Sequence, residues 1–208
     1  MIVTQKCTQS KMQEKQYKIL DLALKHVPFD GWNDNILKLA AKEAGFGEKY
    51  AKVAFKRGAT EAIELFLERI NTETFAKIKE SKLESMKIRE KIFYILDTRL
   101  RIMEGYKPVI RKTTQFLVMP QNLLLAGKLL WDMADKIWYA AGDKATDFNH
   151  YTKRTTLMAV YSSTLLFWLN DESDDHKETS AFLKRRIENV MQFEKVKGKI
   201  KNFAGRCL

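Results

Sequence analysis

Apolar residues recur every three or four positions along most of the chain, which is the spacing that buries one face of an α-helix. Tyr17, Leu20, Leu24 and Val27 follow this spacing near the start of the sequence. No stretch alternates with a period of two over the length of a strand, and the 208 residues include only three prolines and nine glycines. The pattern therefore predicts an all-α fold.

Glycine, proline and polar clusters divide this pattern into separate helices. The predicted helices cover residues 17–27, 33–44, 48–55, 60–70, 88–103, 109–119 and 121–141, with further helices on both sides of an acidic loop at 170–175. Four parts are predicted: a flexible N-terminus at 1–16, a helix-turn-helix subdomain at 17–58, a helical ligand-binding and dimerisation domain at 59–194, and a basic amphipathic segment at 195–208.

The segment 17–58 places two short helices, joined by a glycine-containing turn, behind a longer first helix. This layout is typical of a helix-turn-helix unit, and the segment resembles the N-terminal domain of TetR-type regulators. In that family the third helix enters the DNA major groove. The range 48–55 offers no Asn, Gln or Arg to recognise base edges, so DNA binding and a purely structural subdomain both remain open. Four basic side chains here could reach phosphates: Lys49, Lys52, Lys56 and Arg57.

The chain carries 37 lysines and arginines against 26 acidic residues, which gives a formal net charge of +11. Such a charge favours anionic partners such as acidic lipid or nucleic acid, although scattered lysines also make an ordinary solvated surface. Cys7 and Cys207 lack the spacing of a metal or redox site, and the three histidines lie far apart in sequence. With no nucleophile or phosphate-loop motif either, we expect a protein that is not an enzyme and holds no cofactor or metal.

The predicted helix at 121–141 is apolar around most of its circumference, which exceeds what one core-facing stripe requires. Such a helix is buried, or it presents apolar surface to a ligand, a lipid or a partner helix. Together with the helix that follows, it could enclose an apolar cavity, while ordinary core or a dimer interface is the alternative. The candidate lipid-binding residues are Leu124, Trp131, Trp138, Leu157, Met158, Tyr161 and Leu165.

Charged, amide and aromatic residues crowd into the stretch between these two apolar helices. A turn between core helices does not need all of these groups, so their concentration indicates a role beyond packing. The residues concerned are Asp147, Asn149, His150, Tyr151 and Arg154.

The same stretch resembles the coenzyme Q biosynthesis proteins of the Coq-nine family, which are lipid-binding proteins with a TetR-like fold. The motif is Trp138-Tyr-Ala-Ala-Gly-Asp-Lys-Ala-Thr-Asp-Phe-Asn-His-Tyr-Thr-Lys-Arg. Three shorter pieces support it in the same order: Thr98-Arg-Leu-Arg, Met119-Pro-Gln-Asn and Ala159-Val-Tyr. The resemblance covers roughly residues 17–196.

The resemblance implies a homodimer that binds an isoprenoid quinone intermediate and docks the demethoxyubiquinone hydroxylase. Asp147, Asn149, Tyr151 and Arg154 would then belong to the docking surface. His150, which we include in that surface, stands where the family usually has Trp. Nucleic acid is not an expected partner under this interpretation, whereas a regulator that senses an apolar ligand through the TetR-like fold is the alternative.

The C-terminal end combines an apolar stripe with lysines, as a helix on an anionic membrane surface does. Gly198 and Gly205 weaken its helicity, so a frayed basic tail is the alternative. No apolar signal core or Arg-rich leader precedes Tyr17, and we expect a bacterial protein of the cytoplasm that is peripheral on the inner membrane. The candidate membrane-contact residues are Phe193, Val196, Lys197, Ile200, Lys201 and Phe203.

Overall fold

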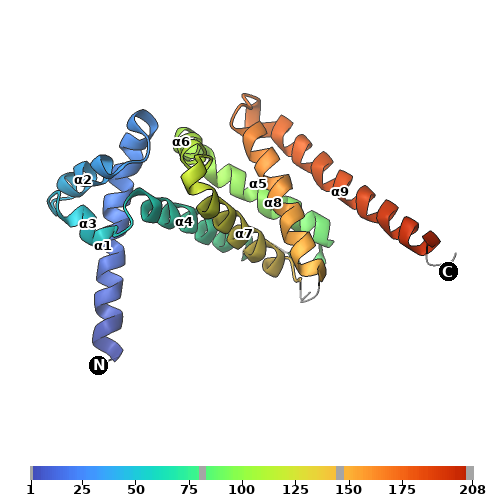
Figure 1. Ribbon diagram of the computed structural model, residues 1–208, viewed down its shortest axis with the longest axis horizontal. Helices are drawn as coiled ribbons and strands as arrows, with labels where there is room; N and C mark the ends of the chain where they lie inside the picture. The colour runs from blue at the N-terminus through green and yellow to red at the C-terminus, as the bar shows by residue number, and fades with distance from the viewer. Residues whose placement is uncertain (1, 80–82, 144–147, 205–208) are drawn as a thin grey trace. The chain divides into compact units, whose positions relative to one another are not determined.

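The computed structural model describes the backbone of residues 2–79, 83–143 and 148–204, and the side chains of 11–78, 83–143 and 149–190. These residues form α-helices, short 3₁₀ turns and connections, with no strand in the ranges described (Figure 1). The all-α prediction is confirmed. The α-helices are α1 (Ile2–Asp30), α2 (Asp34–Glu43), α3 (Tyr50–Ala54), α4 (Ala59–Lys79), α5 (Ile88–Met103), α6 (Lys107–Leu117), α7 (Leu123–Ala140), α8 (Phe148–Trp168) and α9 (Lys177–Ala204).

Helix α1 begins at Ile2 and ends at Asp30. The apolar spacing predicts a helix only at 17–27, after a flexible end at 1–16. Lysine, glutamine, glutamate and methionine, which fill residues 11–16, are good helix formers. Two of them also make contacts: Gln16 Nε2 donates to the Ala54 carbonyl at 2.6 Å, and Met12 Sδ accepts from Tyr50 Oη at 3.6 Å. These contacts attach the added turns of α1 to α3.

Helices α2 and α3 pack on each other and on α1. Asn33 caps α2 by accepting a hydrogen bond at Oδ1 from the Ile36 amide at 3.0 Å. Gly45, at φ +81°, takes the left-handed conformation that ends α2 and opens the turn toward α3. The predicted helix-turn-helix arrangement is present, but α3 spans only Tyr50–Ala54 and is shorter than the predicted 48–55.

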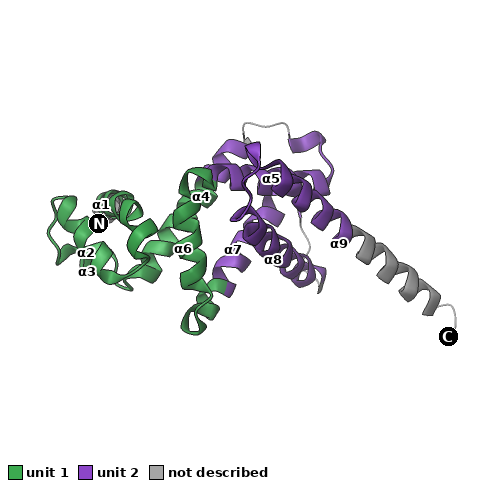
Figure 2. Ribbon diagram, turned by 90° about the horizontal axis from the view of Figure 1, so that it is seen from above, with its two compact units in different colours: residues 1–72, 103–126 green, residues 73–102, 127–208 purple. Residues whose placement is uncertain are grey.

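The chain divides into two compact units, which Figure 2 colours separately. Unit 1 contains residues 1–72 and 103–126, and unit 2 contains residues 73–102 and 127–208. This division differs from the predicted boundary after residue 58, because α4 and α6 supply core to the helix-turn-helix region. Trp32 is buried and donates from Nε1 to Thr113 Oγ1 at 2.9 Å. The Phe66 ring lies 6.2 Å from that of Trp32, between ring centroids.

Helix α4 runs nine residues beyond the predicted end at residue 70. Asn71 and Thr74 interrupt the apolar pattern in sequence, yet both are buried in the structure. Asn71 Nδ2 donates to Glu68 Oε2 on the preceding turn at 3.0 Å, which satisfies a polar group that burial would otherwise leave costly. Buried Ile78 then continues the apolar face to the end of the described helix.

Unit 2 contains α5, the later part of α7, α8 and α9, and α8 packs on α9. Arg99 on α5 donates from Nε to the Tyr161 hydroxyl on α8 at 3.1 Å, and both residues are buried. The rings of Phe167 and Phe182 stack 4.5 Å apart at an interplanar angle of 8°, which joins α8 to α9.

The backbone of α9 continues to Ala204 as one helix, so the predicted segment from residue 195 begins inside it. The side chains of the six candidate membrane-contact residues lie outside the described ones. Among the described helices, none combines the length and the apolar character needed to span a bilayer.

Candidate partner-docking site

Residues 141–143 are the described part of the connection between α7 and α8. Gly142 has φ +92°, and its amide donates to the Tyr139 carbonyl at 3.0 Å. The Asp143 amide donates to the Trp138 carbonyl at 3.0 Å, which completes the end of α7. The helix predicted at 121–141 is present as α7, which ends at Ala140, and the predicted next helix is α8, which begins at Phe148. Asp147, a predicted docking residue, lies outside the described residues.

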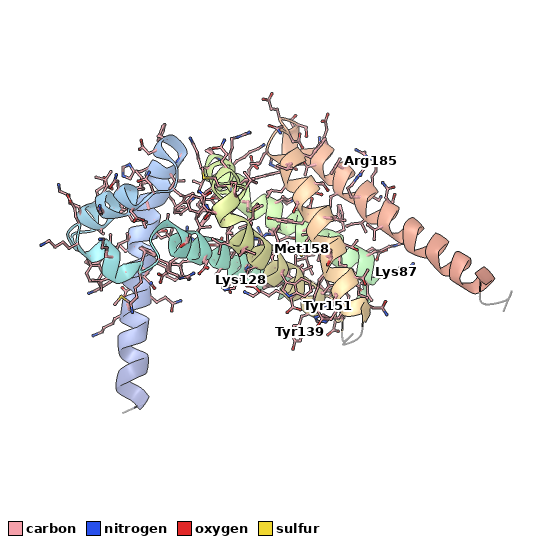
Figure 3. All side chains as sticks on the ribbon, in the orientation of Figure 1. Lys87, Lys128, Tyr139, Tyr151, Met158 and Arg185 are labelled. Atoms are coloured by element: carbon pink, nitrogen blue, oxygen red, sulfur yellow. The ribbon has the colours of Figure 1, made fainter. Side chains whose placement is uncertain are left out.

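Three rings from α7 and α8 meet next to this turn, and we call Trp131, His150 and Tyr151 the aromatic patch. The Trp131 ring centroid lies 5.9 Å from that of Tyr151 and 6.2 Å from that of His150. His150 and Tyr151 meet edge to face at 5.2 Å. Tyr151 is 60% exposed, and Figure 3 labels it on α8. The predicted docking residue Asn149 is also exposed.

Arg154 is only 4% exposed, so its side chain offers little contact area, and its place on the docking surface stays a prediction. Its guanidinium is directed to acidic groups of α7 and of the turn after it. Nε donates to Asp135 Oδ1 at 2.6 Å, and Nη1 lies 3.5 Å from Asp143 Oδ2. Nη1 also donates to the His150 carbonyl at 3.1 Å. The buried cation is stabilised by these partners. Because it bonds both the His150 carbonyl and Asp135, Arg154 links the start of α8, which carries the aromatic patch, to α7.

Lys153 completes this charged base. Its Nζ pairs with Asp143 Oδ1 at 2.7 Å and lies 5.4 Å from the centroid of the Trp138 ring. Trp138 Nε1 in turn donates to the Lys153 carbonyl at 3.1 Å. The first turns of α8 are thus attached to α7 by both ion pairs and an indole hydrogen bond. This arrangement fixes the backbone that carries His150 and Tyr151.

The seven candidate lipid-binding residues fall into different environments. Leu157 and Tyr161 are buried core residues, and the Tyr161 hydroxyl is occupied by Arg99. Trp138 serves the base of the aromatic patch and Trp131 belongs to the patch itself. Met158 and Leu165 are half-buried on α8. Leu124 is 92% exposed and belongs to unit 1. That the seven residues line one lipid cavity stays a prediction.

Sequence reasoning missed the acidic partners of this site. Neither Asp135 nor Asp143 is among the predicted docking residues. The sequence signal for these partners is weak. It consists of one aspartate before Gly142, one aspartate after it, and the basic pair Lys153 and Arg154 near the start of the next helix. Only the crossing of α7 and α8 determines which carboxylate meets which cation.

The basic residues of the helix-turn-helix region are divided between two roles. Arg57 pairs with Glu64, with Nη1 donating to Oε1 at 2.9 Å, and its amide donates to Glu61 Oε2 at 3.1 Å. The hydrogen bonds that Arg57 donates to the Glu64 carboxylate raise the pKa of Arg57. Arg57 is thus engaged within the protein, while Lys49, Lys52 and Lys56 are exposed.

Comparison with known proteins gives consistent relatives for this chain. A family model described as COQ9 matches residues 124–194, which include most of α7 and all of α8. The human mitochondrial ubiquinone biosynthesis protein COQ9 is 31% identical over 186 residues, covering 86% of this chain and 58% of that protein. The mitochondrial coq9 protein of Dictyostelium discoideum is 29% identical over 201 residues, covering 94% of this chain and 66% of that protein.

These relatives are therefore longer than the chain, which spans 58% to 66% of their length. Their names describe mitochondrial proteins, so the expectation of a bacterial cytoplasmic protein stays a prediction.

Solved structures with the same arrangement of helices include two from the TetR group. A TetR transcriptional regulator from Nitrosomonas europaea superposes with a TM-score of 0.67 at 19% identity, covering 83% of this chain and 95% of that one. A TetR-family protein from Rhodococcus sp. gives 0.57 at 20% identity, covering 86% and 99%. At this identity the likeness concerns the fold alone. The family model and the sequence relatives show that the chain is similar to the COQ9 proteins, and the solved structures show that it has a TetR-like fold.

Proposed function

We propose that the chain is a non-catalytic accessory protein of ubiquinone biosynthesis. It binds an isoprenoid quinone intermediate at an anionic membrane and presents the quinone ring to the demethoxyubiquinone hydroxylase, acting as a homodimer. The COQ9 family match and the names of its ubiquinone-biosynthesis relatives support the pathway. The steps within that pathway are inferences from the sequence and from unit 2.

The observation that carries the docking step is the aromatic patch. Protein interfaces take most of their binding energy from a few aromatic and arginine side chains near the centre of the contact. Tyr151 is exposed beside Trp131 and His150, while Arg154 and Lys153 hold the underlying backbone through carboxylates. A rigid patch loses little conformational entropy when it binds, which favours affinity.

The chemistry of the quinone supports a presenting role. Moving a polyprenyl tail out of the bilayer without a dry site would cost about 0.8 kcal/mol for each CH₂ exposed to water. A protein that contacts the membrane through the basic segment from residue 195 and offers apolar surface reduces this cost. Extraction of a co-purifying isoprenoid from the native protein would test this step separately from docking.

The docking step is tested by replacing the exposed ring of the patch. Tyr151→Ala should weaken binding of the hydroxylase by a factor of ten or more, on the order expected for an interface hot spot of about 2 kcal/mol. Isothermal titration calorimetry with the purified hydroxylase measures this directly. Phe29→Ala, which removes an 82% exposed ring from unit 1, is the matched control. Equal affinities for Tyr151→Ala and the unmodified protein would exclude the aromatic patch as the docking site.

A further inference from the structure

A hollow of about 430 Å³ lies between α2, α3 and the residues that follow α3, entirely inside unit 1. Its floor consists of Leu37, Ala51 and Phe55, all of which are buried. Lys38, Lys52 and Lys56 line it as well, and we call it the lysine pocket. Its volume falls within the range of small-molecule sites, which combine an apolar surface with a few polar groups.

The positive charge of the lysine pocket is not neutralised by its neighbours in the part of the chain that the structure describes. Lys38 Nζ contacts only the neutral Asn35 Oδ1, at 3.4 Å. Nearby acidic residues pair elsewhere: Glu48 lies 3.3 Å from Lys42 Nζ, and Glu64 pairs with Arg57. The exposed Lys52 and Lys56 form no ion pair among the described residues.

One carboxylate, that of Asp34, also lines the pocket. It lies against Gly58, where an added Cβ atom would come within 2.2 Å of Asp34 Oδ1. Gly58 has φ +58°, so both the backbone and the close approach require glycine there. Asp34 occupies the first turn of α2, where the helix dipole stabilises a negative charge. Three lysines and one carboxylate therefore line the pocket, which leaves a net charge of about +2.

We propose that the lysine pocket binds an organic phosphate, with Lys52 and Lys56 holding the phosphate oxygens and the floor contacting the adjoining carbon atoms. Lysine ammonium groups act as point charges for phosphate. Two or three of them complement the double negative charge of a phosphate ester better than the single charge of a carboxylate ligand. A concave site with an apolar floor fits a small molecule or a lipid headgroup. Duplex DNA is less suited, because α3 has only five residues and no side chain for bidentate base contacts.

This proposal is independent of the docking and presenting functions and has its own test. Phenyl phosphate is titrated into the full-length protein by isothermal titration calorimetry, with inorganic phosphate as the comparison. We expect saturable binding that is tighter for phenyl phosphate, since only that ligand uses the apolar floor. Lys52→Gln with Lys56→Gln should weaken it about a hundredfold, given two lost charge-assisted hydrogen bonds. Both substitutions are at exposed positions, so the thermal unfolding curve should be unchanged.

The control variant combines Lys25→Gln with Lys49→Gln, which removes the same charge from exposed positions of unit 1 outside the pocket. Equal loss of affinity in this control, or no saturable binding of phenyl phosphate, would overturn the proposal. So would a DNA duplex that binds through Lys52 and Lys56 and is not displaced by phenyl phosphate.

Phosphatidylcholine vesicles with and without phosphatidic acid then separate the two sources of phosphate. Binding that needs phosphatidic acid and is lost in the Lys52 and Lys56 variant assigns the pocket to a lipid headgroup. Binding of phenyl phosphate without such vesicle binding assigns it to a soluble phosphate ester.

Discussion

Tyr151 and Arg154 lie three positions apart on α8, on neighbouring parts of one helix face, but they have opposite environments. Tyr151 is 60% exposed and Arg154 is 4% exposed. The long arginine side chain is buried and reaches Asp135 on α7. The ring of Tyr151 remains at the surface. One residue provides contact area and the other keeps that area in place.

Replacement of Arg154 tests this division. Arg154→Met keeps most of the apolar stem but leaves the carboxylate of Asp143, of which only 6% is exposed, with fewer donors. We expect a loss of about 1–3 kcal/mol in the free energy of unfolding, measured by urea denaturation. The value is below that of a fully buried pair, because Lys153 still pairs with Asp143 and Asp135 is half-exposed. Tyr151→Ala is the control and should change stability by less than about 0.5 kcal/mol; the reverse order would contradict the assigned roles.

The sequence predicted where these residues gather but not which of them are buried. The concentration of polar and aromatic groups from Asn149 to Arg154 is visible along the chain, and the Gly142 turn fixes it between two helices. Burial of Arg154 depends on the distance and rotation of α7, which no local pattern contains. Trp131 was assigned to a lipid cavity for the same reason, although its ring contacts His150 and Tyr151.

At the scale of elements, the connection from α8 to α9 depends on one buried carboxylate. Asp171 accepts hydrogen bonds from the Ser173 amide at 2.8 Å and from the Thr179 amide at 2.9 Å. The Thr179 hydroxyl also donates to it, at 2.5 Å. Burial disfavours the charged form, but these hydrogen bonds outweigh it and hold the pKa of Asp171 well below its ordinary value. The carboxylate thereby caps the start of α9 and fixes the turn.

This lowered pKa predicts a pH-dependent stability. The charged form stabilises the fold above the pKa of the unfolded chain, and the contribution is lost as the pH falls below about 4 toward the lower folded value. Asp171→Asn should lower the free energy of unfolding by about 1–3 kcal/mol at neutral pH, because an amide cannot accept all these bonds. Urea midpoints measured from pH 7 to pH 3 should show the difference between the two proteins becoming smaller below pH 4. A constant difference across that range would contradict this account.

The helices themselves were predicted best where apolar spacing and glycine or proline agree. Asn33 and Gly45 mark α2 closely, and Ile88 marks the start of α5. Predictions failed where polar residues are buried or where helix formers lack an apolar face. Because Asn71 and Thr74 interrupt the apolar spacing, the predicted end of α4 was too early. Because the residues before Tyr17 are mostly polar, the predicted start of α1 was too late.

At the scale of the whole molecule, the net charge of +11 and the basic C-terminal segment predict binding to anionic membranes. Deleting residues 195–208 removes five basic residues and no acidic one. Each basic residue near an anionic surface contributes about 1 kcal/mol, so binding to anionic vesicles should fall about tenfold or more. Ile200→Ser with Phe203→Ser keeps the charge and should also weaken binding, measured by vesicle sedimentation at several salt concentrations. Undiminished sedimentation of the truncated protein would assign the membrane contact to another surface.

The division into units has a consequence for how such a protein can be made and can evolve. Unit 1 takes residues 1–72 and 103–126, so its core is complete only after the ribosome has also made all of residues 73–102, the first part of unit 2. The hydrogen bond from Trp32 Nε1 to the Thr113 hydroxyl can form only after Thr113, eighty-one residues later, has been synthesised. A gene fusion that transferred residues 1–72 alone would carry a helix-turn-helix without its supporting helix. Interleaved units of this kind are inherited together, and recombination within the gene cannot exchange one of them as an independent module.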